Sequence, residues 1–141
     1  MIDITPGQCF SSEVTLNPTL VSEFAKAAGD HNPPMHHDTE FAAKTRFNRL
    51  IVSGTHMTSL LLGLSASYFS KHGSMIGLEF WQRFKRLVYA DETIKLEWLI
   101  IKVTPSKKLN GEVIELRGRI KGSDGHTAVG AKGRVLITDK L

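Results

Sequence analysis

The sequence predicts an α+β domain in which one curved antiparallel sheet packs around a single long helix. Four strand-like segments follow one another in the second half of the chain with only short turns between them, which favours an antiparallel sheet. A helix-like segment in the middle is apolar nearly all round, as expected of a helix surrounded by other structure. With 141 residues, 41% of them hydrophobic, the chain suits a single domain over residues 1–141.

The first helix of the domain follows a short strand. Partial apolar and polar alternation predicts the strand over Gln8–Leu16. Asn17 suits the N-cap position of a helix and Pro18 its first turn, and Gly29 is a plausible C-terminal cap. Asp30 is therefore expected just past the end of a helix.

A stiff loop and a short helix come next. Pro33 and Pro34 favour extended backbone and exclude a regular helix at that point. Asp38 or Thr39 can then cap a short helix over Thr39–Lys44. The rigid loop before that helix is a good place to hold catalytic side chains.

The long helix begins after Ser53, which suits its N-cap, and runs to about Phe69. Turn signals at 90–91, 109–111 and 123–125 separate the segments that follow. The predicted strands of the sheet are Met75–Val88, Thr93–Val103, Val113–Ile120 and Ala128–Ile137. Both tryptophans, Trp81 and Trp98, are expected to pack in or beside the core.

Charge and cysteine content limit the function classes. The net charge is +4, but the basic residues are scattered, so nucleic-acid binding is disfavoured and a nucleotide-bearing thioester suits the charge equally well. The single cysteine allows no internal disulfide, and no basic segment followed by an apolar run opens the chain, so a reducing cytoplasm is expected. The uncharged stretch 53–70 is too polar for a membrane span.

The loop and the start of the long helix form a possible acid–base site. Asp30, Asn32 and His36 supply an acid, an amide and an imidazole, and Gly54 begins a helix whose free N–H groups can stabilise an anion. General acid–base catalysis needs a base, an acid and a donor that stabilises negative charge developing in the transition state. These residues can provide all three.

The sequence resembles the MaoC-like dehydratases and (R)-specific enoyl-CoA hydratases. The resemblance rests on Asp30 to Ala42, on Phe47 to His56 and on Phe84 to Thr93, and it covers nearly the whole chain. It implies a hotdog fold and a homodimer, or a higher oligomer of dimers, with active sites at the subunit interface. The implied activity is that of a hydro-lyase which reversibly hydrates a trans-2-enoyl thioester to the (3R)-hydroxyacyl thioester.

The resemblance also implies roles for individual residues. Asp30 and His36 match the catalytic pair, Asn32 matches the amide beside them, and Gly54 matches the residue whose N–H meets the thioester carbonyl. Ser53 stands where many hydratases have a histidine, as in the variant that reads Ser-Gly-x-His. The substrate would be an acyl-CoA or an acyl-carrier thioester, with coenzyme A as part of the substrate and no separate cofactor.

One departure from the family pattern concerns the chemistry directly. His36 lies six positions after Asp30, whereas the family's histidine lies five positions after the aspartate, so either the loop bulges to restore the geometry or the site is altered. A thioesterase that uses Asp30 to activate water, or a non-catalytic acyl-thioester-binding module, therefore remains an alternative. A metal site among the histidines and acids is disfavoured because their spacing matches no zinc pattern. His56 is expected to point into the core or the dimer interface.

Overall fold

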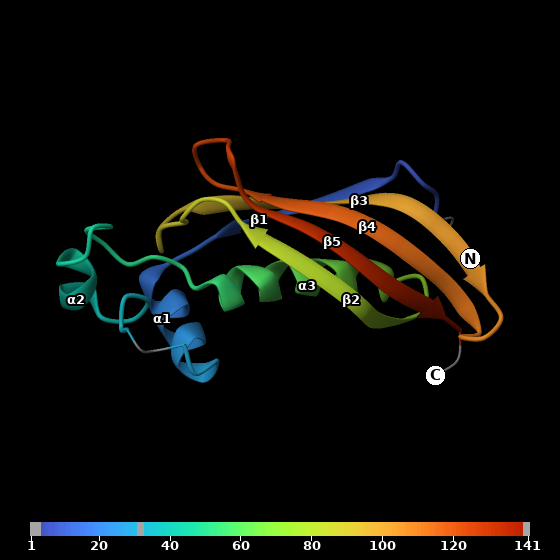
Figure 1. Ribbon diagram of the computed structural model, residues 1–141, viewed down its shortest axis with the longest axis horizontal. Helices are drawn as coiled ribbons and strands as arrows, with labels where there is room; N and C mark the ends of the chain where they lie inside the picture. The colour runs from blue at the N-terminus through green and yellow to red at the C-terminus, as the bar shows by residue number, and fades with distance from the viewer. Residues whose placement is uncertain (1–3, 31–32, 140–141) are drawn as a thin grey trace.

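The computed structural model describes residues 4–30 and 33–139. Along the described chain one strand is followed by three helices and then by four strands, and Figure 1 shows α1 and α2 lying beyond one end of the sheet. In chain order the elements are β1 (Cys9–Thr15), α1 (Pro18–Ala27), α2 (Thr39–Ala43), α3 (Gly54–Phe69), β2 (Ser74–Phe84), β3 (Thr93–Ser106), β4 (Gly111–Lys121) and β5 (Thr127–Thr138).

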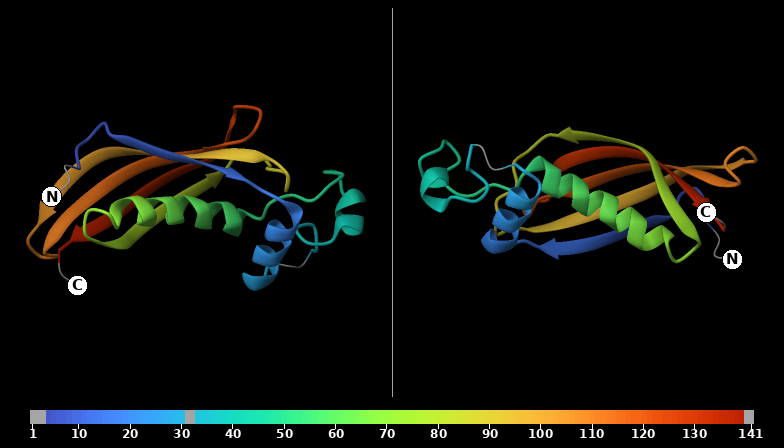
Figure 2. Two further views of the ribbon diagram at one scale, coloured as in Figure 1. Left: turned by 180° about the vertical axis from the view of Figure 1, so that it is seen from behind. Right: turned by 90° about the horizontal axis from the view of Figure 1, so that it is seen from below.

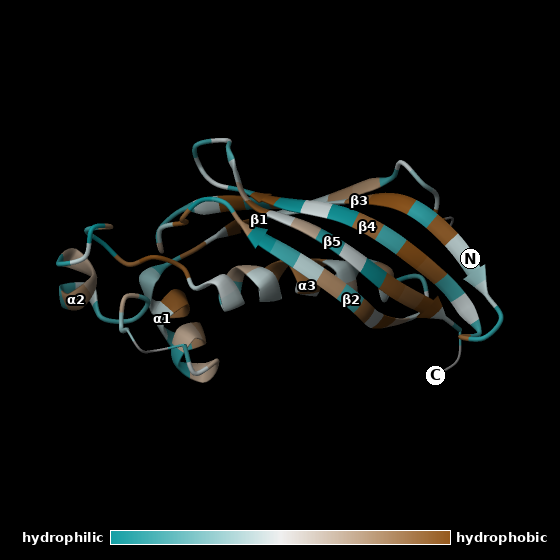
Figure 3. Ribbon diagram, in the orientation of Figure 1, coloured by the Kyte–Doolittle hydropathy of each residue, from teal (hydrophilic) through white to brown (hydrophobic). Residues whose placement is uncertain are grey.

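The five strands form one antiparallel sheet in the order β1-β3-β4-β5-β2. Helix α3 lies along one face of this curved sheet, as the two views of Figure 2 show. Hydrophobic and hydrophilic residues alternate along β4 and β5 (Figure 3), so one face of the sheet packs on the helix. The indole of Trp98 on β3 donates a 2.9 Å hydrogen bond to the Leu61 carbonyl of α3. The predicted α+β class is confirmed.

Local capping chemistry sets where the helices begin. The Asn17 side chain accepts a hydrogen bond from the Leu20 N–H at 2.9 Å, and Pro18 occupies the first turn of α1. The Asp38 side chain caps α2 through the Phe41 N–H at 3.1 Å. These caps confirm the helix starts that the sequence predicts at both places.

Strand β2 ends earlier than the predicted Val88. The N–H groups of Lys85 and Arg86 both donate to the Ala128 carbonyl, at 2.7 and 3.1 Å, so the ladder cannot continue in register. Val88 instead accepts a hydrogen bond from the Val52 N–H at 2.8 Å. The predicted strand therefore ends at Phe84, and Val88 pairs with the segment that leads into α3.

The expected packing of Trp81 is wrong, and a β-bulge explains the error. Trp98 is buried, but Trp81 is 51% exposed. Strict alternation from Met75 would place Trp81 on the helix-facing side of the sheet. The register between β2 and β5 shifts between Gly77 and Glu79, and a one-residue shift moves every later side chain to the opposite face.

Helix α3 is covered on one side only by its own chain, contrary to the expected surrounded helix. Its buried residues are His56, Met57, Leu61, Ser65 and Phe69. The other leucines, at positions 60, 62 and 64, are only partly buried. The helix is apolar around its circumference, as predicted, but the remaining cover is not supplied by the described residues. No helix in the described ranges is long and apolar enough to cross a membrane.

Candidate active site

The end of α1 fixes the backbone of Asp30. Gly29 has φ +77°, a left-handed conformation that glycine adopts without steric cost. The Gly29 N–H donates to the Lys26 carbonyl at 3.1 Å and the Asp30 N–H to the Ala25 carbonyl at 2.8 Å. These two bonds form a Schellman helix end, so a glycine-dependent turn sets the position of the acid.

His36 is held by a hydrogen bond to the segment that precedes α3. Its Nδ1 lies 2.7 Å from the carbonyl oxygen of Ile51, and the ring is buried. Because a carbonyl can only accept, Nδ1 carries the hydrogen and, in the neutral ring, Nε2 keeps its lone pair. Ile51 itself forms a β-bridge with Tyr89. The anchor therefore fixes both the orientation and the tautomer of the imidazole.

The structure brings Asp30 and His36 together across the six-residue interval. Asp30 Oδ2 lies 3.8 Å from His36 Nε2, and the Asp30 side chain is 35% exposed. His36 lies within a turn in which the Pro34 carbonyl accepts the Asp38 N–H at 2.9 Å. The distance of 3.8 Å is too long for a direct hydrogen bond between the two groups. It is short enough for both groups to contact one third atom placed between them.

Ser53 and Gly54 form the start of α3. Ser53 is fully buried, and its Oγ accepts a hydrogen bond from the His56 N–H at 3.2 Å. Among the described residues, none accepts a hydrogen bond from the Gly54 N–H, which is one of the free donors at the helix start. Gly54 follows Ile51 by three residues, so at most about 11 Å of chain separates this donor from the anchor of His36.

Gly54 also contacts the end of β2. A Cβ atom on Gly54 would lie 3.0 Å from Cε1 and 3.1 Å from Cζ of Phe84. Such contacts are tight, so the absence of a side chain allows the aromatic ring to lie against the helix start. The ring is itself 53% exposed. Phe84 thus forms one wall beside the free N–H group.

His56 is a buried histidine with an unpaired nitrogen. Its ring stacks on Phe24 with centroids 4.3 Å apart, and Nδ1 has no hydrogen-bond partner. Burial lowers the pKa of His56 below its ordinary value of 6.5. The neutral imidazole therefore packs inside the protein, which confirms that it points into the core.

Sequence reasoning missed Gln82 on β2. Both amide atoms of this side chain are buried without a hydrogen-bond partner. Gln82 pairs in register with Ala131 and lies two residues before Phe84, on the face of β2 that the bulge turns toward α3. Simple alternation along the strand assigns Gln82 to the opposite face, so its burial could not be predicted without knowledge of the bulge.

Two further predictions concern residues and ligands at the site. Asn32, the expected amide beside the pair, lies outside the described residues. Within residues 4–30 and 33–139, no group of three or more His, Cys, Asp or Glu side chains is placed to hold a metal ion. A hollow of about 800 Å³ lies on the face of the sheet that points away from α3. Asp30, His36 and Gly54 do not line this hollow.

The sequence matches the family described as MaoC like domain over residues 4–116. The chain belongs to this family. An (R)-hydratase from A. caviae, described as involved in PHA biosynthesis, is 28% identical, with 95% of this chain and 97% of that chain covered and a TM-score of 0.84. A search of curated proteins finds no match.

Two more distant structures share the fold. An unliganded R-hydratase from Pseudomonas aeruginosa is 21% identical, with 97% and 84% of the two chains covered and a TM-score of 0.79. A (3R)-hydroxyacyl-ACP dehydratase complex from Mycobacterium tuberculosis is 18% identical, with coverages of 93% and 96% and a TM-score of 0.74. The hotdog fold is confirmed, and family membership together with the A. caviae likeness supports a hydratase or dehydratase, that is, a hydro-lyase.

Proposed function

We propose that the protein catalyses the reversible, (R)-specific hydration of a trans-2-enoyl-CoA to the (3R)-3-hydroxyacyl-CoA. The observation that carries this proposal is the 3.8 Å approach of Asp30 Oδ2 to His36 Nε2, with His36 anchored to Ile51, three residues before the free Gly54 N–H. The chain also belongs to a dehydratase family. Acid, base and oxyanion donor are the three groups that this reaction requires.

The acid–base pair can hold the reacting water. An oxygen atom about 2.8 Å from each of Asp30 Oδ2 and His36 Nε2 fits between them, because their separation is shorter than two such hydrogen bonds. The Nδ1–H of His36 is used by the Ile51 carbonyl, so only Nε2 can exchange a proton with water. Asn32 would orient this water as the third polar group.

Hydration then follows as a balanced proton relay. The Asp30–His36 pair takes one proton from water, and the hydroxide oxygen forms a bond to the β-carbon of the enoyl thioester. The electron pair of the double bond moves toward the thioester carbonyl, whose oxygen becomes an enolate that the Gly54 N–H stabilises. The pair returns the proton to the α-carbon, the enolate collapses, and one water molecule has been added. Dehydration follows the same path in reverse.

We propose a homodimer with the site at the subunit interface, in which a second copy supplies apolar walls for the acyl chain. Strand β2 is at the edge of the sheet, and Ile76, Leu78 and Phe84 on it are exposed. Helix α3, which carries the partly buried leucines, contacts this edge strand. A second copy that covered these apolar groups would enclose the substrate beside Gly54. Sedimentation at several protein concentrations tests this, and a monomer throughout would contradict it.

The first experiment follows the ultraviolet absorbance of crotonyl-CoA while thiol release is measured in parallel. We expect absorbance loss without thiol release, and chiral chromatography should identify the product as the (3R) isomer. Asp30→Asn should abolish the absorbance loss. Asp91→Asn is the matched control, because Asp91 is an exposed aspartate paired with Arg49. Thiol release with an intact double bond would instead identify a thioesterase. Binding of enoyl-CoA without either change would identify a non-catalytic module.

A further inference from the structure

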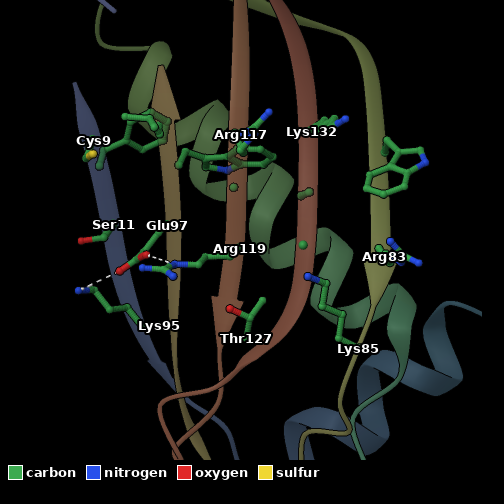
Figure 4. Close-up of a pocket in the computed structure, with 17 residues that line it drawn as sticks. Cys9, Ser11, Arg83, Lys85, Lys95, Glu97, Arg117, Arg119, Thr127 and Lys132 are labelled. Atoms are coloured by element: carbon green, nitrogen blue, oxygen red, sulfur yellow. Dashed lines mark hydrogen bonds and ion pairs between the residues drawn. The ribbon is translucent and has the colours of Figure 1, made fainter. Parts of the chain in front are cut away.

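The face of the sheet that points away from α3 carries an unusual group of cations. The outer basic band is defined here as Arg117 on β4, Lys132 on β5, and Arg83 and Lys85 at the end of β2. All four line the hollow of about 800 Å³ on this face. Figure 4 shows Arg117 and Lys132 side by side on neighbouring strands, with Arg83 and Lys85 further along the face.

The outer basic band places like charges opposite one another. Arg117 and Lys132 are direct cross-strand partners in the β4–β5 register, an arrangement that destabilises a sheet. Within residues 4–30 and 33–139, no carboxylate forms an ion pair with any member of the band. Lys132 Nζ instead lies 5.5 Å from the centroid of the exposed Trp81 ring. The fold alone gives no reason for this concentration of positive charge.

The neighbouring part of the same face shows the opposite pattern. Glu115 is the cross-strand partner of Arg134, and Arg134 also forms a 3.4 Å ion pair with Glu79. Lys102 faces Glu115 from β3. Charges of opposite sign therefore alternate across this row, which stabilises cross-strand pairs. In this neighbouring row each charge faces a charge of opposite sign. The unpaired positive charge of the band is therefore a local feature and not a property of the whole face.

Glu97 is the only acid among the residues that line the hollow, and it is already paired with two cations. Glu97 accepts a 2.6 Å hydrogen bond from Arg119 Nε and forms a 3.1 Å ion pair with Lys95. Both cations lower the pKa of Glu97, with the Arg119 hydrogen bond as the largest cause. Arg119 lies two residues beyond Arg117 on β4 and opposite Gly130, which in turn pairs with Arg83 of the band. Glu97 therefore has two cationic partners already and leaves the positive charge of the band uncompensated.

From this arrangement we infer that the outer basic band is a docking site for a carboxylate-rich surface of a partner protein. Strand spacing is about 4.8 Å and residue spacing about 3.4 Å, so the four cations extend over roughly 10 Å by 13 Å. That size matches several carboxylates on a protein surface rather than one small anion. Trp81 at the side of the band offers the kind of exposed indole that anchors protein interfaces.

Two other ligand classes fit the face less well. A compact phosphate site normally uses converging backbone N–H groups, but those of β4 and β5 are engaged in the sheet ladder on both sides. Binding of single-stranded nucleic acid uses several aromatic platforms along a groove. Among the residues that line the hollow, Trp81 is the only aromatic side chain that is exposed. Side-chain cations on an open face suit carboxylates that approach from solvent.

The test uses the complete protein with poly-L-glutamate as the probe and Trp81 as the reporter. The chain has two tryptophans, and Trp98 is buried, so a neutral quencher such as acrylamide reaches chiefly Trp81. We expect poly-L-glutamate to protect the exposed indole from quenching. Arg117→Glu should weaken this binding about tenfold or more, because it reverses one charge of the central pair. The variant should keep its urea midpoint, since the introduced carboxylate would face Lys132 as an ion pair.

Lys108→Glu is the matched control, because it makes the same change in net charge at an exposed turn between β3 and β4. We expect this control to weaken binding less than about twofold through long-range charge alone. Equal weakening by both substitutions, or no protection of Trp81, would overturn the docking site. Displacement of the probe by millimolar inorganic phosphate would identify a small-anion site instead, and tighter binding of oligo-dT would assign the face to nucleic acid. The docking site does not depend on the proposed hydration, so each can fail alone.

Discussion

The two sides of the candidate active site are built in different ways. Ser53 and Gly54 belong to a helix start that is capped, fully buried at Ser53 and in contact with Phe84. Asp30 and His36 meet across a proline-containing loop, and one of them is about one-third exposed. The oxyanion side is therefore fixed by the core, whereas the acid–base side depends on two anchors, the Schellman end of α1 and the Ile51 carbonyl.

Asp30 can therefore be replaced without disturbing the packing. Changes to the oxyanion side disturb the core, and changes to His36 disturb a buried hydrogen bond. Variants on the two sides should therefore differ in how activity and stability change together.

The largest effect is expected for the acid–base pair. Asp30→Asn should lower kcat about 10²- to 10⁴-fold while the urea midpoint stays the same, because Asp30 acts through proton transfer and not through packing. His36→Gln should lower kcat to a similar extent and also cost about 1–3 kcal/mol of stability, since it weakens a buried hydrogen bond to Ile51. Kinetics and urea unfolding of both variants measure this. Equal loss of stability in Asp30→Asn and His36→Gln would contradict this difference between the two residues.

A second test inserts one methyl group on the oxyanion side. Gly54→Ala should reduce kcat roughly 10- to 100-fold, because the new Cβ meets the Phe84 ring at 3.0 Å and shifts the donor. Phe84→Leu in the same chain should restore part of the loss by removing that contact. Gly63→Ala is the control within the same helix, where the added Cβ has open space around it. It should keep full activity and raise stability by up to about 1 kcal/mol. Failure of Phe84→Leu to restore activity would rule out the steric cause.

The caps of two helices allow a comparison of stability alone. Ser53→Ala should cost about 1–2 kcal/mol, because Ser53 is fully buried and its Oγ also lies 2.9 Å from Thr55 Oγ1. Asn17→Ala removes the exposed cap of α1 and should cost about 0.5–1 kcal/mol. Urea unfolding measures both. A larger cost at Asn17 would show that the start of α3 is less tightly held than its burial indicates.

The smallest effect concerns the pH dependence of stability through His56. The folded pKa of His56 is lowered by burial, so the unfolded chain binds its proton first as the pH falls through about 6.5. Stability is complete above that pH and is lost below it, by less than about 1.4 kcal/mol per pH unit for one proton. His56→Leu should flatten the slope between pH 7 and 5. His126→Gln, at an exposed turn, is the control and should leave the slope nearly unchanged. An unaltered slope in His56→Leu would exclude this histidine as its source.

Local signals explain why much of the fold could be predicted from the sequence. Asn17, Asp38 and Ser53 cap their helices through nearby N–H groups, so each helix start depends on a few adjacent residues. The turns at Asn110 and Gly125 use positive φ, which those residue types tolerate. These features need no knowledge of the rest of the chain.

The errors come from features that only the assembled sheet determines. The bulge between Gly77 and Glu79 reverses the faces of β2, which exposes Trp81 and turns Gln82 inward. The Asp30–His36 approach across six residues likewise depends on the Ile51 carbonyl, which is distant in sequence from both. Sequence spacing could identify the residue types of the site but not their geometry.

The strand order also has a kinetic consequence for the site. Strands β3, β4 and β5 are consecutive neighbours, with Ser106 opposite Gly111, whereas β1 must pair with β3 across most of the chain, Cys9 opposite Leu99. Closing long loops costs more entropy than closing short ones, so the three-stranded meander is expected to form before β1 and β2 join it. In pulse-labelled hydrogen exchange, the Ile114 amide should therefore be protected before that of Val52, and the reverse order would contradict this sequence of events. Asp30, His36 and Gly54 all lie between β1 and β2 along the chain. We therefore expect a folding molecule to form the core of its sheet before these three residues come together as a site.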